Sequence, residues 1–286
     1  MTTAADLPFE LIQEILTFSA WSSLKQASVL ARVSSHIYDL IKPILFRTFI
    51  YWNDKISWPG LHAASNPEWL ELNGKHARNV LLGDEASNLD LTTIISSCPN
   101  ITDLAIWLDG ISDKNLPSLL TLRPHRLSIY LDDFFRGPFQ EAHAKLPMFI
   151  NLTHLDLAGL DRHDLEISWN SIEGVRYVPK LTHLSLSRSM DSISDASAIQ
   201  NSLQHCEHLA VLVLWLESEI LTKELVNEIP FPSTIHEEIS GDPRVVSLES
   251  ASFEQWELGS QGGKDIWAVA DEIVERRMGP WRREWS

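Results

Sequence analysis

A repeated spacing of leucine and isoleucine constrains the fold of this chain more than any other feature. Four segments align without gaps, each with an apolar residue followed by Leu or Ile at +3, Leu at +6 and Leu or Ile at +8. They are CPNITDLAIWL from Cys98, FINLTHLDLAG from Phe149, VPKLTHLSLSR from Val178 and CEHLAVLVLWL from Cys206. Weaker copies surround Leu127 and Val80. The alternating Leu-x-Leu in each copy predicts a short strand with one apolar side.

The +6 positions recur at a period typical of leucine-rich repeats. They are Val80, Leu104, Leu127, Leu155, Leu184 and Leu212, with steps of 24, 23, 28, 29 and 28 residues. One strand cannot bury its apolar side alone, so successive repeats are expected to stack. The sequence therefore predicts an α/β fold: an irregular leucine-rich-repeat solenoid over residues 76–250, with a curved parallel sheet and outer helices. Cys98 and Cys206 occupy positions that also accept Phe and Val, so both thiols are expected to be buried hydrophobes.

The side of the sheet away from the leucines is the natural binding surface of a solenoid. The register places on it an aromatic row of Trp107, Tyr130 and Trp215, and aromatics and Arg are residue types that anchor protein interfaces. An alternative is that a loop or the tail helix covers this row. We also hypothesise that His154 and His183 make binding on this side sensitive to pH. The residues expected to bind a target protein are Trp107, Arg126, Tyr130, His154, Asp156, His183 and Trp215.

The first fifty residues have a different pattern, with three short helices expected. Apolar residues from Leu7 to Leu16 follow helical spacing, and Pro8 suits a first helical position. A second helix is expected over residues 24–30, and Ser34 or Ser35 can cap a third helix over residues 36–49 that contains Pro43. Three short helices bury little by themselves, so part of their apolar surface is expected to need a partner.

The stretch LPFELIQEIL…LARVSSHIYDLIKPILFRTF resembles an F-box, the motif that docks a protein onto the Skp-type adaptor of cullin–RING ubiquitin ligases. The resemblance covers residue 6 to about residue 50, which gives an F-box at 1–50 and a linker helix or loop at 51–75. It departs from the family at Ile37, where an aromatic residue is usual, and Tyr38 follows. The adaptor-binding residues that the resemblance implies are Leu7, Pro8, Leu11, Ile12, Ile15, Leu16, Val33, Ile37 and Tyr38.

The resemblance implies a substrate-recognition subunit of a Skp–cullin–F-box ubiquitin ligase, without catalytic residues or cofactors of its own. Its partners would be a Skp-type adaptor, through it a cullin, and a protein target bound by the repeats. Two alternatives stay open: an adaptor-independent leucine-rich-repeat scaffold that binds protein, and an enzyme with a site that no motif reveals. Among catalytic and nucleotide-binding signatures, GxSxG, HExxH, the P-loop and GxGxxG are all absent from the sequence.

The C-terminal part, residues 251–286, is expected to be a cap and tail. Residues 245–248 predict a last strand, and KDIWAVADEIVERR predicts a helix with Ile266, Trp267, Ala270, Ile273 and Val274 on one face. The segment from DPRVV to this helix is similar to tails of fungal F-box-like proteins. Its expected role is to cap the open end of the solenoid. The Trp/Arg-rich end, residues 281–285, is expected to be a loose end or a small contact site.

Charge and composition exclude several functions. The net charge is −16, and no basic patch could follow a phosphate backbone, so neither nucleic acid nor an anionic membrane is expected as a partner. Two cysteines and no signal-like start favour an intracellular protein, in cytoplasm or nucleus. HCEH at 205–208 and DRHD at 161–164 resemble metal-binding tetrapeptides, but we expect a strand entry and a solvated loop there, and no metal.

Overall fold

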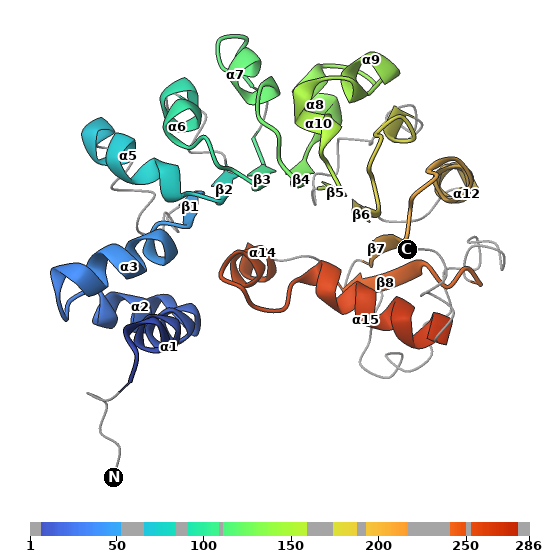
Figure 1. The fold of residues 1–286 in the computed structure, drawn as a ribbon. Coiled ribbons are helices and arrows are strands. Elements are labelled where there is room, and N and C mark those ends of the chain that lie inside the picture. Colours follow the sequence, from blue (N-terminus) through green and yellow to red (C-terminus); the bar gives the residue numbers. More distant parts are fainter. Residues whose placement is uncertain are drawn as a thin grey trace.

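The fold is α/β and is built on one sheet of eight parallel strands in chain order (Figure 1). The computed structural model describes residues 7–52, 66–83, 91–108, 111–158, 174–187, 193–216, 241–249 and 253–279. The strands are β1 (Thr48–Tyr51), β2 (Asn79–Leu82), β3 (Asp103–Ile106), β4 (Arg126–Ile129), β5 (His154–Leu157), β6 (His183–Ser187), β7 (Val211–Leu216) and β8 (Val245–Glu249). Each strand pairs with the next along the chain, which is the order expected from stacked repeats.

The strand register follows the leucine spacing. The six +6 residues form one continuous column, because Val80 pairs with Leu104, and Leu127, Leu155, Leu184 and Leu212 follow strand by strand. All six are buried. The register prediction is therefore confirmed, and so is the last strand at β8.

Helices cover the leucine side of the sheet, which we call the outer face (Figure 1). They are α5 (Pro67–Asn73), the 3₁₀ helix η3 (Gly74–His76), α6 (Leu91–Ser97), α7 (Leu116–Leu120), α8 (Leu131–Phe135), α9 (Glu141–Ala144), α10 (Pro147–Ile150) and α12 (Ile193–His205). The main core lies between these helices and the leucine column. Cys98 and Cys206 are free and buried in it, as predicted, and burial raises the pKa of Cys98 to about 12.

A threonine before several strands forms hydrogen bonds to the preceding repeat. The backbone N–H and the hydroxyl of Thr153 both donate to the carbonyl oxygen of His125, at 2.9 and 3.0 Å. Thr182 makes the same pair of bonds to the carbonyl of Thr153, and Thr102 makes it to the carbonyl of Arg78. The hydroxyl thus adds a side-chain bond where the turns would otherwise rely on the backbone alone.

The first three helices form a bundle at the β1 end of the sheet (Figure 1): α1 (Phe9–Trp21), α2 (Leu24–Leu30) and α3 (Ser35–Leu45). Ser23 and Ser34 cap α2 and α3 by accepting backbone N–H groups at 3.1 and 3.2 Å. The prediction that the third helix reaches residue 49 is wrong, because α3 ends at Leu45 and Thr48–Tyr51 is strand β1. All four β1 residues are buried, so pairing with β2 outweighs continuation of the helix.

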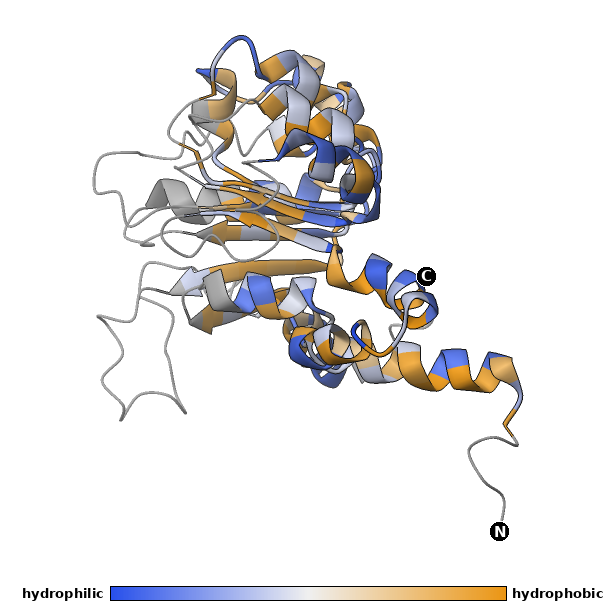
Figure 2. Ribbon diagram, turned by 90° about the vertical axis from the view of Figure 1, so that its left-hand side faces the viewer, coloured by the Kyte–Doolittle hydropathy of each residue, from blue (hydrophilic) through white to orange (hydrophobic). Residues whose placement is uncertain are grey.

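The tail helices α14 (Phe253–Ser260) and α15 (Ile266–Met278) lie on the opposite side of the sheet from the outer helices (Figure 2). We call this concave side the inner face. Trp267, Ala270 and Val274 of α15 are buried, as their spacing predicted. The expected position at the open end of the repeats is wrong, however, because α15 packs on the inner face of β7 and β8. In the part of the chain that the structure describes, no helix is both long and apolar enough to cross a membrane.

Candidate interaction surfaces

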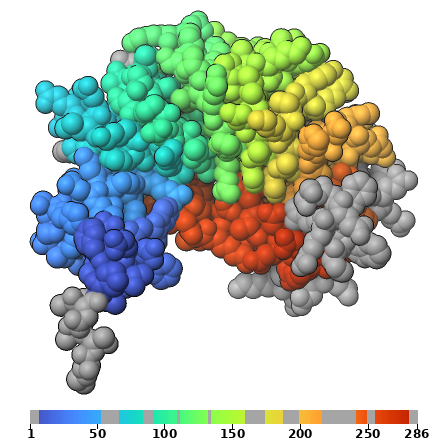
Figure 3. Space-filling model, in the orientation of Figure 1, coloured from blue at the N-terminus to red at the C-terminus, as the bar shows by residue number. Residues whose placement is uncertain are grey.

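The N-terminal bundle presents large apolar side chains to solvent, which we call the N-terminal apolar face. Phe18 is 82% exposed and Val33 is 64% exposed, although both lie in or beside well-formed helices. The bundle projects from one end of the molecule, so this face is not hidden by the sheet (Figure 3). The exposed members are Leu7, Phe9, Leu11, Ile15, Phe18, Trp21, Val29, Val33 and Tyr38. Single exposed apolar residues are ordinary, but a group on one small bundle is a candidate interaction surface.

The nine residues predicted to bind an adaptor divide into two groups. Six are exposed: Leu7, Pro8, Leu11, Ile15, Val33 and Tyr38. Ile12, Leu16 and Ile37 are half-buried, and Ile37 packs against the main core. The residue that departs from the F-box pattern is therefore partly used inside the chain, whereas Tyr38 beside it points to solvent.

Sequence reasoning missed four members of this face: Phe9, Phe18, Trp21 and Val29. Helical spacing could have found Phe18, which lies three residues after Ile15 and seven after Leu11, on the same stripe. Ile15, Phe18 and Trp21 line a shallow depression beside α1, together with Leu40 of α3. Glu10 and Glu14 also line it, so the apolar floor has an acidic border.

The inner face of the sheet is covered by the tail. Val211, Val213 and Trp215 of β7 form an apolar cluster with Trp267 and Val274 of α15. The expectation that Trp215 lies on an open face is therefore wrong: it is 3% exposed, and its indole Nε1 donates to Ser185 Oγ at 2.6 Å. The alternative reading, in which the tail helix folds over the aromatic row, is confirmed at Trp215.

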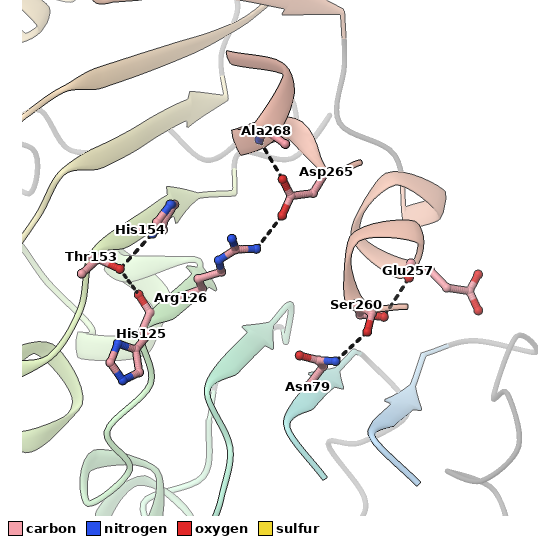
Figure 4. A network of polar contacts seen from close by, with 9 residues as sticks. All are labelled: Asn79, His125, Arg126, Thr153, His154, Glu257, Ser260, Asp265 and Ala268. Atoms are coloured by element: carbon pink, nitrogen blue, oxygen red, sulfur yellow. Dashed lines mark hydrogen bonds and ion pairs between the residues drawn. The ribbon is translucent and has the colours of Figure 1, made fainter. Parts of the chain in front are cut away.

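Arg126 joins the sheet to the start of α15. Its guanidinium forms an ion pair with Asp265, at 2.5 Å, and Asp265 also accepts the backbone N–H of Ala268 as the N-cap of the helix (Figure 4). Asp103 lies close to this pair, and burial raises its pKa to about 6, although the charge of Arg126 opposes the shift. Arg126, predicted to meet a target, is thus occupied within the chain.

The two predicted histidines lie under α15 as well. The rings of His154 and His183 stack with centroids 4.0 Å apart, and Trp267 lies edge-on to both. Nε2 of His183 lies 3.3 Å from a carboxylate oxygen of Asp271 on α15. Burial, with the nearby His183 and Arg126, lowers the pKa of His154 to about 2, so that ring stays neutral.

Asp156 is held between neighbouring strands rather than offered to solvent. Ser128 donates to its Oδ2 at 2.7 Å, and Trp107 Nε1 in turn donates to Ser128 Oγ at 2.8 Å. Burial raises the pKa of Asp156, and the hydrogen bond from Ser128 opposes that shift. Of the seven residues predicted to bind a target, Trp107 and Tyr130 are half-buried beyond the ends of β3 and β4. Whether any of the seven binds a target stays a prediction.

Within the described ranges, no group of three or more His, Cys, Asp or Glu side chains could hold a metal ion. The DRHD segment at 161–164 and the Trp/Arg-rich end at 281–285 lie outside the described residues. The described surfaces are an exposed apolar face on the N-terminal bundle and an inner face on which Arg126, Asp156 and His183 contact other groups of the chain. No known family model and no curated protein matches this sequence.

Proposed function

We propose that this chain is a substrate receptor of a Skp–cullin–F-box ubiquitin ligase. In this proposal residues 1–50 are an F-box that docks onto a Skp-type adaptor, and the eight-stranded sheet is an irregular leucine-rich-repeat solenoid that carries the target. The chain performs no bond chemistry. It raises the effective concentration of the target beside a ubiquitin-loaded enzyme that the complex supplies.

The N-terminal apolar face is the observation that carries the proposal. Six of the nine positions that the F-box resemblance implies are exposed, and Phe18 and Trp21 add exposed rings to the side of α1 that carries Ile15. The bundle has its own buried residues, Ala20 and Ala27, and Ile41 and Leu45 join it to the sheet. It therefore holds its shape while an apolar surface remains uncovered in the described chain, which is the property a docking module needs.

The test is co-expression of the full chain with a Skp-type adaptor, followed by size-exclusion chromatography. A one-to-one complex is expected, and the double variant Leu11→Asp with Ile15→Asp should abolish it because two charges enter the apolar interface. The matched control is Leu72→Asp, which changes an exposed leucine on α5, outside the three helices of the bundle. This control should leave the complex intact.

Circular dichroism and thermal unfolding of the double variant separate docking from folding. An intact fold without adaptor binding supports the receptor. A wild-type chain that stays monodisperse and ignores the adaptor would leave the second candidate, an adaptor-independent scaffold. The half-buried Ile37 is the observation that favours this second candidate, since the F-box pattern places an aromatic residue there.

A further inference from the structure

The tail helices touch the inner face at points spread along the whole sheet. At the first strands, the carbonyl oxygen of Ser260, the last residue of α14, accepts bonds from Thr48 of β1 at 3.2 Å and from Asn79 of β2 at 2.7 Å. In the middle, Asp265 pairs with Arg126 of β4, as Figure 4 shows beside the Asn79–Ser260 bond. At the last strands, α15 packs on β7 and β8 through its buried apolar face.

The same tail also touches the N-terminal bundle. Gly262, in the turn between α14 and α15, has φ +86°, and a Cβ added there would lie 3.4 Å from the indole of Trp21, the last residue of α1. The guanidinium of Arg47 lies over the ring of Trp21, 4.2 Å from the ring centroid. The α14–α15 turn therefore meets the end of α1 directly, with Arg47 at the junction.

Burial of apolar side chains between the tail helices and the sheet indicates a fixed segment rather than a lid that opens. Val211, Val213 and Val246 of the sheet are 0% exposed, and so are Ala270 and Val274 of α15. Lifting the tail would expose both apolar surfaces together, and it would leave the Ser260 carbonyl and the Arg126–Asp265 pair without their partners. A reversible lid has few buried apolar contacts, and this segment has many.

We infer that α14 and α15 act as a permanent strut that spans the concave side of the sheet and fixes the orientation of the N-terminal bundle. The strut contacts β1, β2, β4, β7 and β8. Its turn at Gly262 contacts Trp21 and so fixes the position of α1 relative to the sheet. Loosening the strut anywhere near β1 and β2 therefore loosens the N-terminal bundle. This inference concerns the chain alone and does not depend on adaptor binding.

Hydrogen–deuterium exchange of the full chain tests the inference, with Asn79→Ala as the variant. This change removes the shorter bond to the Ser260 carbonyl and also the 3.0 Å bond from Asn79 to Thr48. Exchange should rise about tenfold in the amides of α14 and, through the Gly262 turn, in those of α1. The matched control is Asn73→Ala, which also removes a buried asparagine and one bond, to the Trp69 carbonyl, but makes no contact with the tail.

Unchanged exchange in α1 in the Asn79 variant, or an equal rise in the Asn73 control, would overturn the inference. If Asn79→Ala fails to fold, Trp21→Ala gives the second test, since Trp21 is 40% exposed and tolerates truncation. That variant should raise exchange in the turn at residues 261–264. Its control, Phe18→Ala on the same helix, should not, and equal effects of the two variants would again count against the strut.

Discussion

His154 and His183 stack with nearly parallel rings, at an interplanar angle of 9°, directly beneath Trp267 of α15. Burial, with the nearby His183 and Arg126, disfavours a positive charge on His154 and lowers its pKa to about 2. Protonation of His154 is therefore coupled to unfolding of the chain. The two rings thus form a contact within the chain, and the hypothesis that they make target binding sensitive to pH stays a prediction.

The first prediction is that His154 lowers stability in acid. Its pKa is about 2 in the folded chain and 6.5 in the unfolded chain, so the unfolded state binds more protons at any pH between these values. Its contribution to stability is complete above pH 6.5 and falls by up to about 1.4 kcal/mol per pH unit as the pH decreases below that value. Urea unfolding from pH 7 to pH 4 should show a shallower acid loss in His154→Asn. The exposed His208→Asn is the control, and an unchanged slope in the His154 variant would contradict the prediction.

Asp103 should have the opposite effect. Burial raises its folded pKa to about 6 from an ordinary 3.8, so the folded state binds the extra proton between these values. Stability linked to this group is present below pH 3.8 and is lost as the pH rises through 6. The variant Asp103→Asn should match the wild type near pH 4 and exceed it by on the order of 1 kcal/mol at pH 8. Equal stability of the two proteins at pH 8 would show that Arg126 fully compensates the buried charge.

Much of the fold could be predicted from the sequence because the repeats constrain it redundantly. Each marker residue must be buried, and the column from Val80 to Leu212 fixes both strand order and register. Strand β1 escaped prediction because Phe46 and Phe49 also continue the apolar pattern of α3. Only the pairing of Thr48–Tyr51 with β2, a long-range contact, decides between helix and strand there.

The residues of the inner face could be predicted from the sequence, but not that the tail helices cover them. Alternation correctly placed Arg126, His154 and Trp215 away from the leucine side. It could not show that α15 lies against them, because the sequence distance from Arg126 to Asp265 is 139 residues. Val211 and Val213 lie on this face, and they were the signal that it is covered. Two valines on one side of a strand favour a buried surface over a binding face open to solvent.

The N-cap of α15 supplies the third prediction. Asp265 both caps the helix and pairs with Arg126, so Asp265→Ala removes two interactions and should cost about 2 kcal/mol of unfolding free energy. Asp265→Asn keeps a capping oxygen and loses only the charge, and should cost about half as much. Guanidinium unfolding of both variants measures the difference. Equal losses would show that the ion pair, rather than the cap, dominates at this position.

The last prediction separates side chains that serve the fold from those held for a partner. Phe18 is 82% exposed, whereas Ile41 of the same bundle is fully buried in the main core. Ile41→Ala should lower the unfolding free energy by about 2–5 kcal/mol, because it removes buried methyl groups and leaves a cavity. Phe18→Ser should change it by less than about 0.5 kcal/mol, since little of that ring is removed from water on folding.

Phe18→Ser should also weaken binding of a hydrophobic dye to the native chain, because the most exposed ring of the N-terminal apolar face is gone. A large loss of stability in Phe18→Ser would mean that this ring belongs to the core, and that the apolar face is smaller than the structure shows.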